Sequence, residues 1–405
     1  MEGKEILFNL NCDMTVTLAI AALLLLLGHG IKRCVPLLRR FFIPAPVVGG
    51  LFFAFITLAG YHFGLFTFTF DSTLKNLLMN TFFTSVGFLA SLRFLVKGGM
   101  AVGIFLAGAL GLIVVQNTTG VVLAELFGLN PLIGLATGSI SLSGGHGTAA
   151  AFGPLLEDYG LEAGLSVSVA AATFGLVAGS MIGGPIGRIL MARHSLHCPN
   201  NAEALVTEGR NEEEKLEHSF GEKALFAACV FLILAQGVGY FLNMGFQKLG
   251  IIFPSYLCPM FVACLIRNYC DFFHKPIPMH TIGIVGSLSL QFFLAMALMT
   301  LKLWELASLA VPLVTILLLQ TVIMGIYVYF ITFRIMGSDY DAAVMTCGHC
   351  GFGMGATPNA MANMETFTGA NGPSAKAFFV VPLVGSLFID FFNAFIITSF
   401  IQLLI

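Results

Sequence analysis

Two glycine-rich segments carry residues whose types and spacing point to ligand binding. The first lies at 131–153 and reads Thr137-Gly-Ser-Ile-Ser-Leu-Ser-Gly-Gly-His-Gly-Thr148, and the second lies at 342–364 and reads Cys347-Gly-His-Cys-Gly-Phe-Gly-Met-Gly-Ala-Thr-Pro-Asn359. Because each glycine costs a helix about 1 kcal/mol relative to alanine, both segments predict interrupted helices. An interrupted helix offers bare amides to anions and freed carbonyl groups to cations. The candidate anion-binding residues are Ser141, Ser143, Gly144, Gly145, His146, Gly147 and Thr148 in the first segment, and Gly351, Gly353, Gly355, Thr357 and Asn359 in the second.

Tight helix packing is the alternative explanation for these glycines, because small residues let membrane helices approach closely. Two features favour a binding site. The segments occupy equivalent places in the two halves of the chain, and each adds Ser, Thr or Asn side chains to its glycines. Irregular backbone at membrane depth survives where protein buries it or where it lines a cavity. We therefore expect each segment to form a hairpin whose tip lies at a binding site.

One acid, Asp390, stands in the middle of an otherwise apolar stretch, Phe388-Ile-Asp-Phe-Phe-Asn393. Carboxylates are costly inside a membrane and usually face a cavity or a partner. Asp390 is therefore a candidate ligand for a cation or a substrate ammonium group, with Asn393 one turn along the same face. An ordinary buried hydrogen bond is the alternative. Weaker cation-binding candidates, which hydrogen bonds between helices explain equally well, are Gln116, Asn117 and Gln320.

The sequence gives little support to enzyme or cofactor chemistry. His146 and His349 lack the neighbouring carboxylates or thiolates that would complete a zinc site. Cys347-Gly-His-Cys350 copies the tetrapeptide of disulfide isomerases, but that chemistry needs a thioredoxin context and access to water. No phosphate-binding loop for ATP is present, and no Ser-His-Asp or His-Glu-x-x-His arrangement stands out. We therefore expect no catalytic centre, no cofactor and no bound metal other than a transported cation.

The composition places the chain in lipid. Of 405 residues, 57% are hydrophobic and only 10% are charged, with a mean hydropathy of +0.92. Soluble proteins carry roughly 25% charged residues. The apolar runs are continuous rather than alternating, which excludes a transmembrane β-barrel. A net charge of −2 without a basic patch excludes a nucleic-acid partner. The prediction is an all-α polytopic membrane protein.

Ten apolar stretches predict membrane crossings, each of which needs about 20 residues. The first is a retained helix rather than a cleaved signal, because acidic residues precede it and no small-x-small site follows it. The ten stretches are 14–31, 44–63, 76–92, 100–123, 165–187, 224–244, 251–266, 280–301, 306–333 and 377–400.

The placement of lysine and arginine predicts the topology, since inner loops are enriched in both residues. We place the amino terminus outside and let both glycine-rich segments re-enter the membrane from the side on which they start. Fifteen of the 19 basic residues then fall inside. The four outside are Lys4, Lys75, Lys248 and Lys302. Both termini are then outside, and the charged stretch 194–222 is inside.

The chain also shows a faint duplication. Weak matches recur in order at offsets of about 203 to 210 residues, among them Gln116 with Gln320 and His146 with His349. Five crossings per half is an odd number, so the two halves must be inverted, as in many secondary transporters. The predicted parts are a five-helix repeat at 1–193 with its hairpin near 131–153, a charged loop at 194–222, and a second five-helix repeat at 223–405 with its hairpin near 342–364.

Several motifs resemble the bacterial sodium/glutamate symporter family. They are Gly138-Ser-Ile-Ser-Leu-Ser-Gly-Gly-His-Gly-Thr148, Ala171-Ala-Thr-Phe-Gly-Leu-Val177, the stretch from Ala295 to Ala307, Tyr340-Asp-Ala-Ala-Val344, and Gly348-His-Cys-Gly-Phe-Gly-Met-Gly-Ala-Thr-Pro358. The resemblance runs from the first helix to the last, apart from the central loop. Cys347 departs from the family, which more often has a small uncharged residue there, but the glycine pattern is intact.

The resemblance implies Na⁺-driven uptake of L-glutamate across the bacterial inner membrane, through two inverted five-helix repeats with one re-entrant loop each. Amides of Ser143–Thr148 and Gly351–Thr357 would hold the glutamate carboxylates, while Asp390 and Asn393 would hold Na⁺ or the ammonium group. We also expect periplasmic termini, a cytoplasmic central loop, a homodimer, and a scaffold made from the first two helices of each repeat. A carrier of another dicarboxylate or a citrate-like anion, and an ion or anion channel, are the alternatives.

Overall fold

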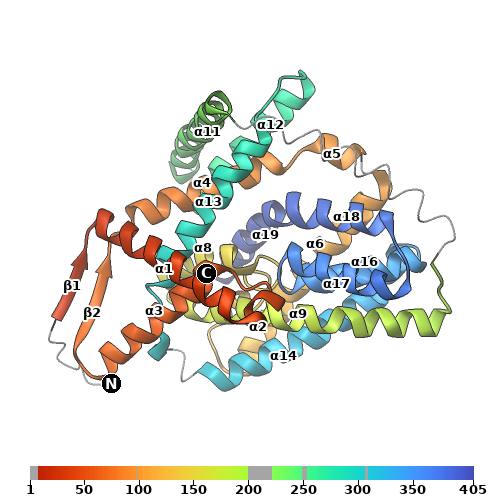
Figure 1. Ribbon diagram of the computed structural model, residues 1–405, viewed down its shortest axis with the longest axis horizontal. Helices are drawn as coiled ribbons and strands as arrows, with labels where there is room; N and C mark the ends of the chain where they lie inside the picture. Colours follow the sequence, from red (N-terminus) through yellow and green to blue (C-terminus); the bar gives the residue numbers. More distant parts are fainter. Residues whose placement is uncertain (1–7, 98, 199–220, 249–252, 306–308) are drawn as a thin grey trace.

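Helices make up nearly all of the computed structural model, which describes residues 8–97, 99–198, 221–248, 253–305 and 309–405 (Figure 1). Each of the ten predicted crossings contains a helix. Most of the predicted central loop, 199–220, and the predicted outer residue Lys4 lie outside the described residues.

The N-terminal half begins with three long helices and two short ones and continues with four more. The first set is α1 (Met14–Cys34), α2 (Pro36–Arg40), α3 (Ala45–His62), α4 (Thr73–Leu89) and α5 (Leu92–Lys97). The second set is α6 (Gly99–Leu126), α7 (Pro131–Ala136), α8 (Gly145–Asp158) and α9 (Gly164–His194).

The C-terminal half follows the same order. It begins with α11 (Glu222–Lys248), α12 (Leu257–Phe272), α13 (Met279–Leu298) and a 3₁₀ turn at Leu303–Glu305. α14 (Ala310–Tyr327) runs through a π-helical turn at Val328–Thr332 into α15 (Phe333–Ile335). The last helices are α16 (Tyr340–Gly353), α17 (Thr357–Asn371), α18 (Ala375–Leu387) and α19 (Ile389–Leu404).

Seven of the described helices are long and apolar enough to cross a membrane, and the pair α18–α19, bent by 46°, makes an eighth. α4 and α12 have 17 and 16 residues and are shorter. Large apolar side chains face outward from several of these helices, such as Leu26 of α1 at 71% exposure and Phe241 of α11 at 72%. Exposed apolar faces of this kind fit a lipid environment. The protein is a multi-pass membrane protein.

The chain is helical as predicted, apart from one short two-stranded parallel sheet that was not predicted from the sequence. β1 (Phe8–Cys12) pairs with β2 (Phe66–Phe70), with Phe8 opposite Phe66 and Cys12 opposite Phe70. β2 reads Phe-Thr-Phe-Thr-Phe, and this alternation is typical of a strand. The rings of Phe68 and Phe70 stack at 5.7 Å. Parallel strands need a long crossover connection, which here consists of α1, α2 and α3.

Six helices form a unit that we call the scaffold group: α1, α3, α4, α11, α12 and α13. α4 packs along α12 and α13, α3 packs along α1 and α13, and α11 packs along α12. The sequence predicts only the first two helices of each half in this unit, and the structure adds α4 and α13. Small residues bring these two helices close to their neighbours, since a Cβ on Gly87 of α4 would lie 2.1 Å from the Met260 carbonyl oxygen of α12.

α6 to α9 and α14 to α19 form a second unit, the hairpin group, and most of it lies in the right half of Figure 1, with α8 near the centre. α9 presents a glycine at every fourth position to the α16–α17 pair: Gly175, Gly179, Gly183 and Gly187. A Cβ on Gly175 would lie 2.2 Å from the Met354 carbonyl oxygen, so direct backbone contact depends on the glycine. The two groups touch where α8 meets α13 and where α18 and α19 meet α4.

Candidate functional site

The first glycine-rich segment folds as a helix, an irregular tip and a second helix. Asn130 caps α7 by accepting the Leu132 amide at 3.0 Å, and Pro131 occupies the first turn, where a missing N–H costs nothing. α7 ends at Ala136, and α8 begins at Gly145, whose φ of +62° favours glycine. We call residues 137–145 tip 1.

The second segment folds back on itself at residues 353–357, which we call tip 2. α16 ends at Gly353, and α17 begins at Thr357 with Pro358 in its first turn. The two helices lie against each other at Gly351, where a Cβ would come within 2.4 Å of the Ala360 amide nitrogen. Glycine is therefore needed at this close approach for a steric reason. Both glycine-rich segments thus form the helix–break–helix arrangement that the sequence predicts.

Tip 1 and tip 2 meet inside the protein. A Cβ on Gly145 would lie 3.0 Å from the Gly355 carbonyl oxygen. Gln116 of α6 binds both tips: its Nε2 donates to the Gly353 carbonyl at 2.7 Å, and its Oε1 accepts from Ser143 Oγ at 2.6 Å. Gln320 of α14 donates to the Gln116 carbonyl at 2.7 Å. The amino ends of α8 and α17 therefore begin beside each other.

This junction suits an anion. The first amides of a helix have no intrahelical acceptor, and the amino end carries the positive end of the helix dipole. Here two such ends lie together in the protein interior, where polar interactions are stronger than in water. Of the twelve residues predicted to bind the anion, all are buried except Gly144, Gly147 and Thr357, which are partly exposed. The structure thus brings the predicted residues of both glycine-rich segments together at the junction of the tips.

A second cluster surrounds Ser139 of tip 1. The side-chain oxygen of Asn117 (α6) accepts the Ser139 amide at 2.9 Å, and Asn393 Nδ2 (α19) donates to the Ser139 carbonyl at 3.1 Å. All three side chains are fully buried. Asn393 Oδ1, Ser139 Oγ and Asn117 Nδ2 have no hydrogen-bond partner in the structure. Two buried oxygens without partners are what a small cation needs from a protein.

Asp390 lies three residues before Asn393, in the first turn of α19 directly after the bend at Phe388. It is half-buried, and no described group forms a hydrogen bond or ion pair with its carboxylate. Helix breaks free backbone carbonyl groups, which are further cation ligands. Three of the predicted cation-binding residues, Asn117, Asn393 and Asp390, thus come from α6 and α19, which pack against each other. Gln116 and Gln320 lie instead at the junction of the tips.

Other predicted residues have protein partners. Ser141 Oγ lies 2.5 Å from the Ala136 carbonyl and 2.7 Å from the Ser168 carbonyl. Asn359 Nδ2 donates to the Leu176 carbonyl at 2.9 Å and lies 3.1 Å from Ser180 Oγ, while its Oδ1 has no partner. These contacts hold tip 1 and tip 2 against α9.

The two histidines do not form a metal pair. His146 Nε2 lies 3.0 Å from Thr173 Oγ1, and His349 Nδ1 lies 2.9 Å from Thr332 Oγ1. No group of three or more metal-ligating side chains exists in the described part of the chain. Cys347 and Cys350 are both fully buried, away from water. The structure thus gives both histidines hydrogen-bonded positions on the helices that carry the tips.

Ser139 was not among the predicted site residues, although it lies inside the first glycine-rich segment. Its neighbours Ser141 and Ser143 have the same chemistry, and only the packing shows which hydroxyl lacks a partner. Thr173 and Thr332, the hydrogen-bond partners of His146 and His349, were also not predicted from the sequence. A hydroxyl one helix away from each histidine has no signature in the sequence.

Comparisons with known proteins bear on this geometry. Residues 10–373 match the sodium/glutamate symporter family. The sodium/glutamate symporter of Escherichia coli (strain K12) is 41% identical over 396 residues, which cover 97% of this chain and 98% of the relative. That of Haemophilus influenzae (strain ATCC 51907 / DSM 11121 / KW20 / Rd) is 39% identical over 381 residues, covering 93% and 94%. These matches cover nearly the whole chain, which is therefore a transporter rather than an enzyme. This chain belongs to the sodium/glutamate symporter family.

Proposed function

We propose that this protein imports L-glutamate across the bacterial inner membrane, coupled to Na⁺ and by alternating access. The observation that carries the proposal is the meeting of two helix amino ends at Gly145 and Gly355, beside a buried cluster of oxygens without partners. The first feature suits carboxylates and the second suits Na⁺. The near full-length match to named sodium/glutamate symporters supports both assignments.

Glutamate binds at the junction of the tips in this proposal. Within the predicted ranges Ser143–Thr148 and Gly351–Thr357, the amides of Gly144, Gly145, Gly355 and Ala356 already donate to backbone carbonyls. The amides in the first turns of α8 and α17 therefore take the carboxylates, and the bridge through Gln116 keeps the two tips in register. None of the described arginines is needed, because helix ends supply the positive potential. Glutamate carries a net charge of −1, so co-bound Na⁺ offsets the cost of moving it through a low-dielectric medium.

Na⁺ binds around Ser139. Asn393 Oδ1 and Ser139 Oγ are the buried ligands, and Asp390 supplies the charge. The Ser139 carbonyl belongs to tip 1, which leads directly into the first turn of α8, so filling the cation site orders that part of the anion site. This arrangement explains coupling, because each ligand favours the tip conformation that the other requires.

We assign residues 1–193 and 223–405 to two inverted repeats, joined by a cytoplasmic loop at 194–222. The packing supports this assignment, since α1 packs on α3 as α11 packs on α12, and α3 packs on α13 as α12 packs on α4. In this scheme α7–α8 and α16–α17 are re-entrant hairpins near 131–153 and 342–364. Both termini are periplasmic, in agreement with the bias of basic residues.

Alternating access then moves the hairpin group against the scaffold group. The contacts between the groups are few compared with those inside each group, as a moving unit requires. The scaffold group also supplies the interface of a homodimer, and α11 offers an apolar face with Phe226, Ile233 and Phe241 exposed. A monomeric mass in both detergent and membranes would disprove the homodimer.

Transport by the purified protein in proteoliposomes tests the function. We expect glutamate accumulation above its external concentration when a Na⁺ gradient points inward. Equilibration without accumulation would support a channel. If aspartate or citrate displaced labelled glutamate better than glutamate itself, the substrate assignment would be wrong.

A further inference from the structure

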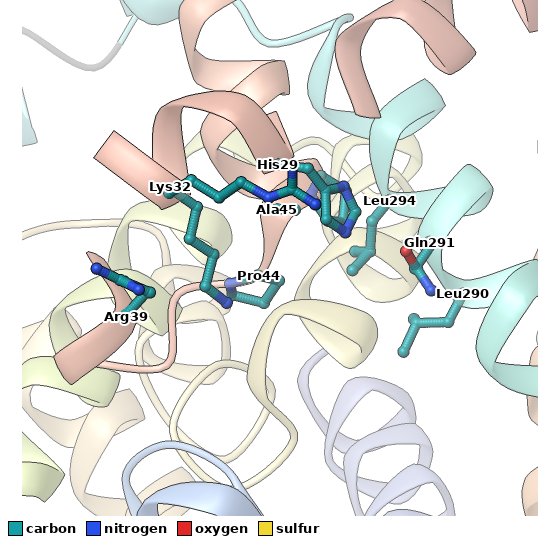
Figure 2. Close-up of a pocket in the computed structure, with 10 residues that line it drawn as sticks. His29, Lys32, Arg39, Pro44, Ala45, Leu290, Gln291 and Leu294 are labelled. Carbon is teal, nitrogen blue, oxygen red and sulfur yellow. The ribbon is translucent and has the colours of Figure 1, made fainter. Parts of the chain in front are cut away.

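A basic pocket lies between α1, α2, α3 and α13 (Figure 2). Its volume is about 390 Å³, and its floor is apolar, with Pro44, Leu290 and Leu294. Figure 2 shows His29 of α1 and Gln291 of α13 facing each other across the opening, with Lys32 extending toward Pro44. Arg33 and Arg39 complete the rim.

The positive charges of this rim have no counter-charge. No acidic residue is among the described residues that line the pocket. Lys32, Arg33 and Arg39 form no ion pair with any described residue. Only His29 is partly engaged, through a 2.8 Å hydrogen bond between Nδ1 and the Leu25 carbonyl. A concave site lined by one sign of charge concentrates ions of the other sign.

One wall of the pocket contacts the first turn of α8. Leu290 lines its floor, and a Cβ on Gly147 would lie 3.3 Å from Leu290 Cδ1. Gly147 stands in the first turn of α8, at the amino end to which we assign substrate carboxylates. The α13 wall of the pocket is therefore in contact with the start of that helix. Leu290 therefore lies between the basic pocket and the start of α8.

We propose that this pocket is a vestibule that collects the anionic substrate on the cytoplasmic side and passes it to or from tip 1. The inference rests on the proposed function. Lys32 and Arg33 belong to α1 of the scaffold group, and Arg39 belongs to α2, which packs against α1, so the rim stays in place while the hairpin group moves. Lys32, Arg33 and Arg39 hold the dicarboxylate loosely as it leaves or enters, and the binding site itself contains no arginine.

Glutamate transport measured from each side tests the vestibule, in right-side-out and everted membrane vesicles. For the triple variant K32Q/R33Q/R39Q we expect the KM for glutamate on the cytoplasmic face to rise at least threefold, because electrostatic steering changes association rates by about 10-fold or more. The periplasmic KM should stay within twofold. Arg40→Gln is the matched control, since Arg40 neighbours Arg39 but does not line the pocket.

Two variants of Gln291 keep the test decisive if the triple variant fails to insert into the membrane. Gln291→Lys should lower the cytoplasmic KM and Gln291→Glu should raise it, because both place a charge on the opposite wall. An unchanged cytoplasmic KM, or an equal effect from Arg40→Gln, would overturn the vestibule. The vestibule would also be overturned if the change in cytoplasmic KM appeared only in vesicles with phosphatidylglycerol and vanished in phosphatidylcholine vesicles. That result would assign the pocket to a lipid headgroup. If wild-type vesicles showed no Na⁺-dependent transport at all, the proposed function would fail instead.

Discussion

Three buried polar atoms around Ser139 have no hydrogen-bond partner among the described residues. A buried polar group without a partner costs about 1–3 kcal/mol. The other amide atoms of Asn117 and Asn393 form hydrogen bonds with the Ser139 backbone and hold it in position. A bound cation would compensate that cost for the two oxygens, Ser139 Oγ and Asn393 Oδ1. We therefore place Na⁺ here rather than at Gln116, whose amide is already engaged at both ends.

The charge of Asp390 should set the affinity for Na⁺. Asp390→Asn removes the formal negative charge beside Asn393 and should raise the half-activating Na⁺ concentration about tenfold or more, which corresponds to about 1.4 kcal/mol. Initial uptake rates across a Na⁺ titration measure this. Asp158→Asn, at the exposed end of α8, is the control and should leave the titration unchanged. Unaltered Na⁺ activation in Asp390→Asn would show that this carboxylate is not a ligand.

The hydroxyl of Ser139 should matter for Na⁺ more than for folding. Ser139→Ala removes an oxygen that has no protein partner, so the melting temperature in detergent should hardly change while Na⁺ activation weakens. Ser141→Ala is the comparison, because Ser141 Oγ contacts two carbonyls and its loss should cost about 1 kcal/mol of stability. The idea fails if Ser139→Ala destabilises the protein yet keeps normal Na⁺ dependence.

At the scale of helices, the glycine pattern predicts the two breaks well. The breaks after Ala136 and Gly353 fall inside the predicted segments, because a run of glycines has a local energetic cost that a sequence displays. The bend at Phe388 and the strand at Phe66–Phe70 were not predicted. The short strand forms by pairing with residues far away in the chain, and its alternation ends too soon to stand out beside an apolar helix.

The glycines of α9 show how an element positions the site. Gly175→Ala should shift tip 2, since the new Cβ would meet the Met354 carbonyl at 2.2 Å, and should destabilise the protein by about 1–3 kcal/mol. Gly184→Ala is the matched control on the same helix, with nothing within 4 Å of the new methyl group. Thermal unfolding in detergent and glutamate uptake measure both variants. Equal stability of the two variants would mean that the α9–tip 2 contact does not hold the hairpin.

For the whole molecule, the sequence predicts the class and the layout better than the partners. Composition places the chain in lipid, and the basic residues indicate one orientation. That Gln116 reaches Gly353, or that Asn393 reaches Ser139, depends on contacts across more than 200 residues. Period and spacing carry no information about such pairs. The membership of α4 and α13 in the scaffold group was not predicted for the same reason, because it depends on packing between helices from different halves of the chain.

In the proposed mechanism, the two meeting tips hold glutamate while Na⁺ fills the neighbouring oxygen cluster. The most direct measurement is labelled L-glutamate uptake into proteoliposomes of the purified protein with Na⁺ outside and K⁺ inside. We expect transient accumulation above the external concentration, which disappears when Na⁺ is equal on both sides. Uptake that never exceeds equilibration, or that proceeds equally with K⁺ on both sides, would contradict this mechanism.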